Sequence, residues 1–190
     1  MRIVVFGASS RAGLYIVKEA LERGHRVAAF TSRPGIFPLG HPKLDIIGGD
    51  ILDPAAVARA VSGAHGVICA LGARWGKAAA AGHSKGPENI IWGMEAAGCR
   101  RVVWLASAGC LGRGPSARED AFGRILASGL DWVLVDTPRF RDGSGPVRVQ
   151  VGSADRAGKY VYLADLAAFL VEELESGRYL KKIIAVLSHE

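Results

Sequence analysis

The sequence has no apolar run long enough to cross a membrane and only three cysteines among its 190 residues. A membrane-spanning helix needs about 18 or more consecutive apolar residues, whereas the runs here are broken by glycine, proline and charge. The apolar stretch at residues 3–6 is too short for a signal peptide and lacks a cleavage region. Cys69, Cys99 and Cys110 do not have the spacing of metal ligands. These absences predict a cytoplasmic protein with reduced thiols and no bound metal.

Clustered positive charge is also missing, although the formal net charge is +6. Lys and Arg occur singly or in pairs such as Arg100 with Arg101, and no basic helix is interleaved with aromatic residues. Proteins that bind a nucleic-acid backbone collect such charge on one face. The sequence therefore favours a small anionic molecule as partner and predicts neither nucleic acid nor a membrane in that role.

What the sequence does contain is an alternation of short apolar runs with helical patterns. Strands made of Val, Ile and Leu throughout are typical of parallel sheets covered on both faces, and their alternation with helices implies right-handed crossovers. The fold class predicted is α/β, with residues 1–190 forming a single doubly wound parallel-sheet domain. After Pro138 the pattern loosens over residues 139–152, and the tail from there on is expected to form the closing edge of the sheet and a wall of a pocket. The expected strands are 2–6, 26–31, 44–47, 66–70, 101–106, 132–135 and 182–187, and the expected helices are 12–23, 54–62, 85–97, 117–128 and 163–175.

The segment GASSRAG joins the first expected strand to the first expected helix. Gly7 permits a tight turn and Gly13 permits close packing of helix on strand, as in loops that bind the pyrophosphate of a dinucleotide. Ser10 stands where such loops usually have a third glycine, so the pyrophosphate either lies slightly further out or is contacted by the hydroxyl. Leu14 and Tyr15 exclude a P-loop, and the alternative is a simple strand-to-helix turn. The residues assigned to the pyrophosphate are Gly7, Ala8, Ser9, Ser10, Arg11, Ala12 and Gly13.

The end of the second expected strand indicates which cofactor would bind. An acidic residue about 20 residues after the loop holds the ribose 2′-hydroxyl of NAD, whereas an arginine there accommodates the 2′-phosphate of NADP. This sequence has Thr31, Ser32 and Arg33 and no carboxylate. It therefore predicts NADP, with NADPH preferred over NADH, and the alternative is that Arg33 is only a solvated surface residue.

Further candidate cofactor contacts follow the third and fourth expected strands. Asp50 with Ile51 could contact the adenine, or Asp50 could cap the helix that starts near residue 54, although Asp53 is better placed for that role. The remaining candidates are small enough for the middle of the cofactor to pass over the sheet; they are Ala70, Leu71 and Gly72.

Several longer stretches resemble the NmrA-like family of atypical short-chain dehydrogenases, and within it the group of flavin reductases and biliverdin-IXβ reductases. They are VVFGASSRAG, GGDILD, SKGPENIIWGMEAAGCRRVVWLASAG, SGLDWVLVDTPRFRDG and YLADLAAFLVEEL. The resemblance runs over nearly the whole chain. It implies a single Rossmann domain that binds NADP and moves hydride to a flat conjugated acceptor such as a flavin.

The resemblance also implies roles for residues beyond the expected fifth and sixth strands. Ser107 falls on the family's active-site serine, and Thr137, Pro138 and Arg139 fall on the segment that touches the carboxamide and lines the acceptor pocket. For Ser107 the alternatives are a hydroxyl that satisfies backbone at a strand end and a hydrolase elbow, which Leu105 disfavours because the elbow needs glycine there.

The sequence also departs from the family pattern. Asp136 and Thr137 replace the Arg-Pro pair that commonly ends the sixth strand, and no Tyr-x-x-x-Lys pair follows the fifth strand. A proton would then come from Ser107, from water, or with electrostatic help from Arg139, which matches a histidine of some reductases. The first interpretation is an NADPH-dependent reductase that acts on a small-molecule acceptor. The alternative is a non-catalytic NADP sensor.

Overall fold

Eight strands form one central sheet in the computed structural model, which describes residues 1–71, 85–106, 122–151 and 160–188. Seven of the strands are parallel, and β8 pairs with β10 in the antiparallel direction. This arrangement confirms the predicted α/β fold with a doubly wound parallel sheet. In sheet order the strands are β3 (Leu44–Gly48), β2 (Arg26–Thr31), β1 (Arg2–Phe6), β4 (Gly66–Cys69), β5 (Arg101–Ala106), β6 (Asp131–Asp136), β10 (Lys182–Ser188) and β8 (Val147–Val151).

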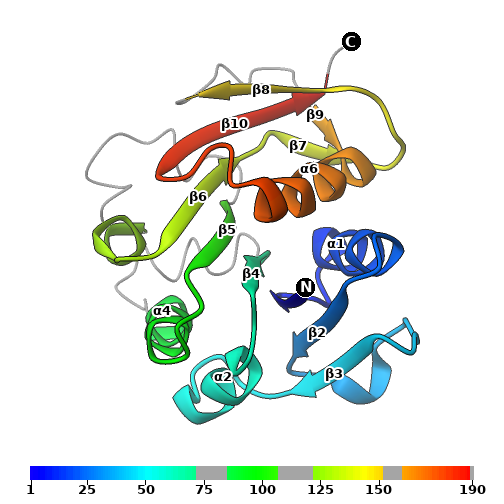
Figure 1. Ribbon diagram of the computed structural model, residues 1–190. Coiled ribbons are helices and arrows are strands. Elements are labelled where there is room, and N and C mark those ends of the chain that lie inside the picture. The colour runs from blue at the N-terminus through cyan, green and yellow to red at the C-terminus, as the bar shows by residue number, and fades with distance from the viewer. Residues whose placement is uncertain (72–84, 107–121, 152–159, 189–190) are drawn as a thin grey trace.

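Helices cover both faces of the sheet, as Figure 1 shows. One apolar core lies between the sheet and the helices α1 (Arg11–Glu22) and α6 (Leu163–Ser176). A second core lies on the opposite face, under α2 (Pro54–Val61), α4 (Lys85–Ala96) and the helical residues 122–127. Because the strands between the two cores are buried on both faces, they consist of nearly continuous Val, Ile and Ala.

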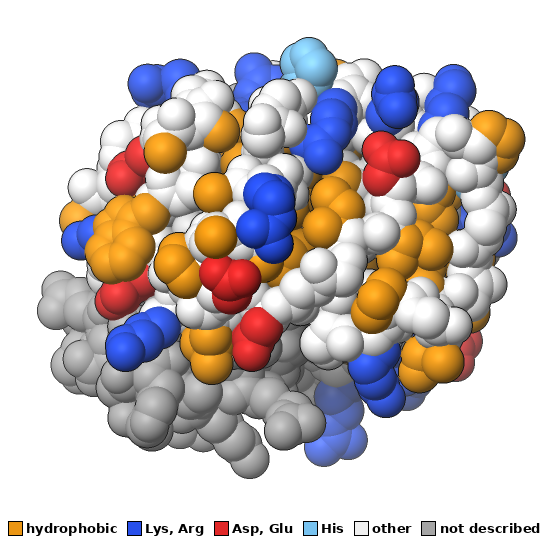
Figure 2. All heavy atoms as spheres, turned by 90° about the horizontal axis from the view of Figure 1, so that it is seen from below, with side chains coloured by type: hydrophobic (Ala, Val, Ile, Leu, Met, Phe, Trp, Pro, Cys, Tyr) orange, Lys and Arg blue, Asp and Glu red, His pale blue; other side chains and the backbone are white. Residues whose placement is uncertain are grey.

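The β3 edge of the sheet is the exception to this burial. Its side chains are exposed or half-buried, and Ile46 keeps 39% of its surface exposed. β3 and α2 lie lowest in Figure 1 and face the viewer in Figure 2, where hydrophobic side chains stand in separate groups among charged and uncharged ones. Lys and Arg on this face are likewise separated from one another by other surface.

The stretch that follows β6 is more ordered than the sequence predicts. No strand was expected within residues 139–152, but they contain β7 (Arg139–Arg141) and the strand β8, which lies at the edge of the sheet beside β10. A further strand, β9 (Tyr160–Tyr162), pairs with β7 in a separate two-stranded sheet. The tail therefore does close the edge of the sheet, but the individual strands were not predicted because strands this short depend on distant pairing partners, which no local pattern reveals.

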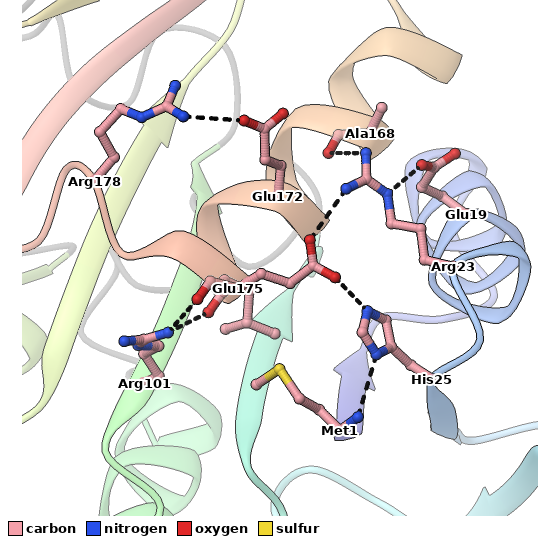
Figure 3. A network of polar contacts seen from close by, with 10 residues as sticks. Met1, Glu19, Arg23, His25, Arg101, Ala168, Glu172, Glu175 and Arg178 are labelled. Carbon is pink, nitrogen blue, oxygen red and sulfur yellow. Dashed lines mark hydrogen bonds and ion pairs between the residues drawn. The ribbon is translucent and has the colours of Figure 1, made fainter.

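The carboxyl end of α6 contacts the carboxyl end of α1 and the amino ends of β2 and β5, as Figure 3 shows. The Glu175 carboxylate pairs with the Arg23 guanidinium at 3.1 Å and with Nε2 of His25 at 2.7 Å. From the other side, the Arg101 guanidinium donates to the backbone carbonyls of Leu174 and Glu175. These contacts fix α6 against α1 and β5 at the edge of the sheet opposite the carboxyl ends of the strands.

Two of the three thiols lie within the described residues. Cys69 and Cys99 are free and buried, and burial raises the pKa of both, that of Cys99 to about 11. They are therefore protonated at neutral pH, as expected for ordinary thiols; Cys110 lies outside the described residues. Among those residues, no group of His, Cys, Asp or Glu is placed to hold a metal ion, and no helix is long and apolar enough to span a membrane.

Candidate functional site

A pocket of about 610 Å³ opens at the carboxyl ends of the first strands. Its volume lies within the usual range for small-molecule sites, and its position beside β1 is where ligands bind in open parallel sheets. The lining comes from four segments that are distant in sequence: the loop after β1, the ends of β2 and β3, and the end of β4. The lining residues are Gly7, Ser9, Ser10, Phe30, Thr31, Ser32, Pro34, Gly48, Gly49, Asp50, Ile51 and Leu71.

The loop after β1 turns as the sequence predicts. Gly7 has a φ of 76°, and a Cβ there would overlap the carbonyl group of Ala70. A Cβ on Gly13 would overlap the carbonyl oxygen of Gly7. Only glycine therefore fits at either position, and the close approach brings the first turn of α1 directly behind the pocket.

Ser10 uses its hydroxyl within the protein. Its Oγ accepts a hydrogen bond from the Gly13 N–H at 3.0 Å, which makes Ser10 the N-cap of α1, and donates one to the Ala70 carbonyl at 3.1 Å. Because a hydroxyl has a single proton, Ser10 has none left to donate to a ligand. The N–H groups of Arg11 and Ala12 come next in the chain, and within the described residues neither donates to a protein acceptor.

Arg11 points toward a neighbouring loop. Its guanidinium forms an ion pair of 2.6 Å with Asp142, which follows β7, and the Tyr15 hydroxyl donates to the same carboxylate. The hydrogen bond from Arg11 lowers the pKa of Asp142 below its ordinary value. Both partners of the ion pair are more than half exposed, so Arg11 can leave Asp142 without opening the core.

The end of β2 is tied to the glycine loop through two hydroxyls. Ser9 Oγ lies within hydrogen-bond distance of Thr31 Oγ1, which also accepts from the Arg33 N–H at 3.1 Å. Ser32 and Arg33 are exposed beyond this point, and within the described residues the Arg33 guanidinium forms no ion pair with a carboxylate. The rim of the pocket therefore carries an exposed arginine with no ion-pair partner among the described residues.

Four lining residues were not predicted from the sequence. Phe30 packs beneath Gly49, where a Cβ would overlap its ring, and Pro34 packs in the same way against Gly48. In the sequence, the signal for Phe30 and Pro34 is the pair Gly48 and Gly49 at the end of β3, because glycine at such a place often marks a close approach of other groups to the backbone.

The residues after β3 include Asp50 and Asp53, for which the sequence left open a role in the pocket or as the cap of α2. Asp53 caps α2 by accepting from the Ala55 N–H, as predicted. Asp50 lines the pocket while its carboxylate accepts from the Leu52 N–H at 2.9 Å. The buried Asn89 on α4 donates to the Ile51 carbonyl at 3.0 Å, a long-range contact that no sequence pattern revealed.

The residues after β6 include an unusual buried hydroxyl. Asp136 at the end of β6 and Thr137 and Pro138 directly after it are buried, and within the described residues Oγ1 of Thr137 has no hydrogen-bond partner. Such a group in a protein interior calls for a ligand or another explanation. Arg139 is exposed next to it. Ser107 and Gly72 lie outside the described residues, whereas Ala70 is buried at the end of β4 with its N–H bonded to the Phe6 carbonyl.

A parallel sheet with a glycine turn, a helix N-terminus and a pocket beside them defines a dinucleotide-binding protein of the Rossmann class. Residues 7–177 match the NAD(P)H-binding family, and the chain belongs to that family. The match begins at the first glycine of the loop and ends just after α6, so it includes every segment that lines the pocket.

Known proteins similar to this chain agree with the family. A 3β-hydroxysteroid dehydrogenase/Δ5→4-isomerase of Mycobacterium tuberculosis is 28% identical over 152 residues, or 74% of this chain, which spans only 38% of that protein's length. Among solved structures, a Burkholderia pseudomallei protein provisionally described as exported is 26% identical, with a TM-score of 0.79 over 98% of this chain and 99% of that one. A Streptococcus pneumoniae protein provisionally described as an NADH-flavin reductase has a TM-score of 0.78 over the full length of both chains at 24% identity.

Proposed function

We propose that this protein is an NADPH-dependent reductase of the NmrA-like, flavin-reductase type, which transfers hydride to a flat conjugated acceptor. The observation that carries the proposal is the pocket that joins the glycine loop to an end of β2 without a carboxylate. Dehydrogenases and a provisionally described flavin reductase among the similar proteins agree with this chemistry.

The glycine loop fits a pyrophosphate. Gly7 and Gly13 leave no room for side chains, and the open N–H groups of Arg11 and Ala12 stand at the positive end of the α1 dipole. Since the Ser10 hydroxyl is already engaged, the backbone and the Arg11 guanidinium would supply the donors.

The end of β2 fits a 2′-phosphate. Ser32 and Arg33 are exposed at the pocket rim, and Thr31 is held in place by Ser9. A guanidinium binds phosphate through parallel N–H donors, and no acidic side chain stands at this strand end to repel it. Asp50 and Ile51 would border the adenine on the far side of the same pocket.

The carboxyl end of β6 fits the nicotinamide end. When bound, the cofactor supplies the hydride, so the protein needs mainly to align donor and acceptor. The unpartnered Thr137 hydroxyl would bond the carboxamide, with Pro138 beside it, and Ser107 would orient the ring and the acceptor. Arg139 would stabilise negative charge on the reduced acceptor, which takes its proton from Ser107 or water.

Turnover separates the reductase from the alternative of a non-catalytic NADP sensor. The purified protein is mixed with NADPH and FMN, and the loss of absorbance of the reduced nicotinamide is followed. Oxidation of NADPH well above the rate with free flavin alone supports the reductase. Tight NADPH binding without such oxidation would support the sensor and overturn the reductase.

Cofactor selectivity tests Arg33. We expect Arg33→Ala to weaken NADPH binding by about tenfold or more, because it removes a charge-assisted contact with the 2′-phosphate, and to change NADH binding less than threefold. Quenching of protein fluorescence in titrations with each cofactor measures both constants. The control is Arg59→Ala, which removes an exposed arginine from the last turn of α2. Equal losses for NADPH and NADH would show that Arg33 does not contact the phosphate.

A further inference from the structure

The two-stranded sheet of β7 and β9 presents one face of arginine and tyrosine. Arg139 is in register with Tyr160, and Arg141 is in register with Tyr162. Because side chains alternate along a strand, these four residues share one face. The residues between them, Phe140 and Val161, pack against the core on the opposite face. We call the four the Arg-Tyr face: Arg139, Arg141, Tyr160 and Tyr162.

The contacts within the Arg-Tyr face hold its rings in a fixed arrangement. The Arg141 guanidinium lies 3.8 Å from the centre of the Tyr160 ring, and the two tyrosine rings meet edge to face with centres 5.1 Å apart. A hydrogen bond with Tyr160 raises the pKa of Tyr162, so the Tyr162 ring stays uncharged at neutral pH. A stacked guanidinium keeps its N–H edge available for an oxyanion.

The loop that follows β7 packs against the Tyr162 ring through two glycines. Side chains at Gly143 or Gly145 would press on opposite edges of the Tyr162 ring, with distances of 3.2 and 3.0 Å from a Cβ to the nearest ring atoms. The two glycines let the backbone pack directly on the ring. Tyr162 is therefore confined while the arginines on its face remain exposed.

The acidic groups closest in sequence are engaged elsewhere. Asp142 pairs with Arg11 at 2.6 Å, and Asp165 accepts the Gly145 N–H at 2.6 Å. Within the part of the chain that the structure describes, neither Arg139 nor Arg141 forms an ion pair. Two positive charges beside two aromatic rings thus have no ion-pair partner among the described residues.

We propose that the Arg-Tyr face is an acceptor subsite that selects planar aromatic molecules carrying a phosphate or carboxylate. The proposal rests on the proposed reductase function, because Arg139 begins β7 directly after the segment assigned to the nicotinamide. A guanidinium pair binds an oxyanion through parallel N–H donors, and the tyrosines offer a surface on which a flat ring stacks.

FMN and riboflavin test the subsite, because they share one ring system and differ by a phosphate. We expect kcat/KM for FMN to exceed that for riboflavin by about tenfold or more, as a charge-assisted contact implies. Arg141→Gln should reduce the ratio of the two kcat/KM values to nearly one. Arg141→Lys should restore part of the preference, because it returns the positive charge without the parallel N–H donors of a guanidinium. Arg100→Gln is the control, since it removes an exposed arginine at the opposite edge of the sheet and should retain the preference.

A binding measurement without NADPH separates this proposal from the proposed function. Stacking on the tyrosines should quench the fluorescence of a bound flavin, and the titrations should give a lower Kd for FMN than for riboflavin. Arg141→Gln should abolish this difference in Kd. Equal kcat/KM for the two flavins, with equal quenching, would overturn the subsite while leaving the reductase intact. Selective FMN binding without NADPH oxidation would instead overturn the reductase and leave the oxyanion-selective face standing.

Discussion

At the scale of the residue, Ser10 shows how a side chain can replace a loop glycine. A glycine at this position would leave the backbone open, but Ser10 bridges α1 and the end of β4 through Gly13 and Ala70. N-cap hydroxyls of this kind stabilise a helix by about 1 kcal/mol. Ser10 therefore stabilises the loop. The sequence left two alternatives, a pyrophosphate that lies further out and one that the Ser10 hydroxyl contacts. The second would require Ser10 to give up its hydrogen bond to the Ala70 carbonyl.

If the proposed function is correct, Asp142 competes with the pyrophosphate of the cofactor for Arg11. We expect Asp142→Asn to tighten NADPH binding about two- to fivefold, the effect of an exposed ion pair on affinity. Because the hydrogen bond with Arg11 lowers the pKa of Asp142, the carboxylate stays charged at neutral pH, and the competition is lost only as the pH falls through this lowered pKa. Titrations at low and high salt measure the effect, which salt should reduce by screening the pair.

The matched control for this variant is Asp131→Asn, which removes the carboxylate paired with Arg100 far from the pocket. It should leave NADPH binding unchanged at every salt concentration. If Asp142→Asn weakens NADPH binding instead, Asp142 positions Arg11 for the cofactor rather than competing with it.

At the scale of the element, α6 depends on Glu175 for its position against α1. Glu175→Ala removes one partner of Arg23, which keeps Glu19, and one partner of the buried His25, which keeps the N-terminal amine. We expect it to lower the free energy of unfolding by about 1 to 2 kcal/mol, since the carboxylate makes two charge-assisted contacts while remaining partly exposed. Urea unfolding measures the change.

Glu172→Ala is the control on the same helix. Its carboxylate pairs with Arg178, and both side chains are about half exposed, so the free energy should change by less than about 0.5 kcal/mol. Equal losses for the two variants would mean that the network in Figure 3 contributes no more than an ordinary surface ion pair.

The elements also show how far the sequence predicts this fold. The buried parallel strands and the Asp53 cap were predictable because each follows from a local pattern of burial or capping. β7 and β9 have three residues each, too few for a period to show. Their pairing partners lie about 20 residues apart in the chain, so only the assembled molecule defines them.

At the scale of the whole molecule, the candidate site joins segments that the parallel sheet brings to one edge. The sequence could assign the loop, Thr31 and Asp50 to this site because carboxyl ends of parallel strands meet there. It could not predict the hydrogen bond from Asn89 to the Ile51 carbonyl or the ion pair between Asp142 and Arg11. Those contacts depend on how helices and late strands pack, which local sequence does not encode.

Because the site draws on separate segments, NADPH should stabilise the folded molecule as a unit. At a concentration one hundred times Kd, a ligand that binds only the native state adds about 2.7 kcal/mol to the free energy of unfolding. For a domain of this size that corresponds to a rise in Tm of roughly 5 to 10 °C, measurable by calorimetry.

Hydrogen exchange identifies where the stabilisation arises. Amides of residues 7–13, 31–34 and 48–51, which border the pocket, should exchange more slowly with NADPH bound because their local opening would require its release. Amides of residues 62–65 and 97–100 precede β4 and β5 at the opposite edge of the sheet and open without disturbing the pocket. Their exchange should stay the same, and a rise in Tm with no protection of the three pocket segments would place the cofactor elsewhere on the molecule.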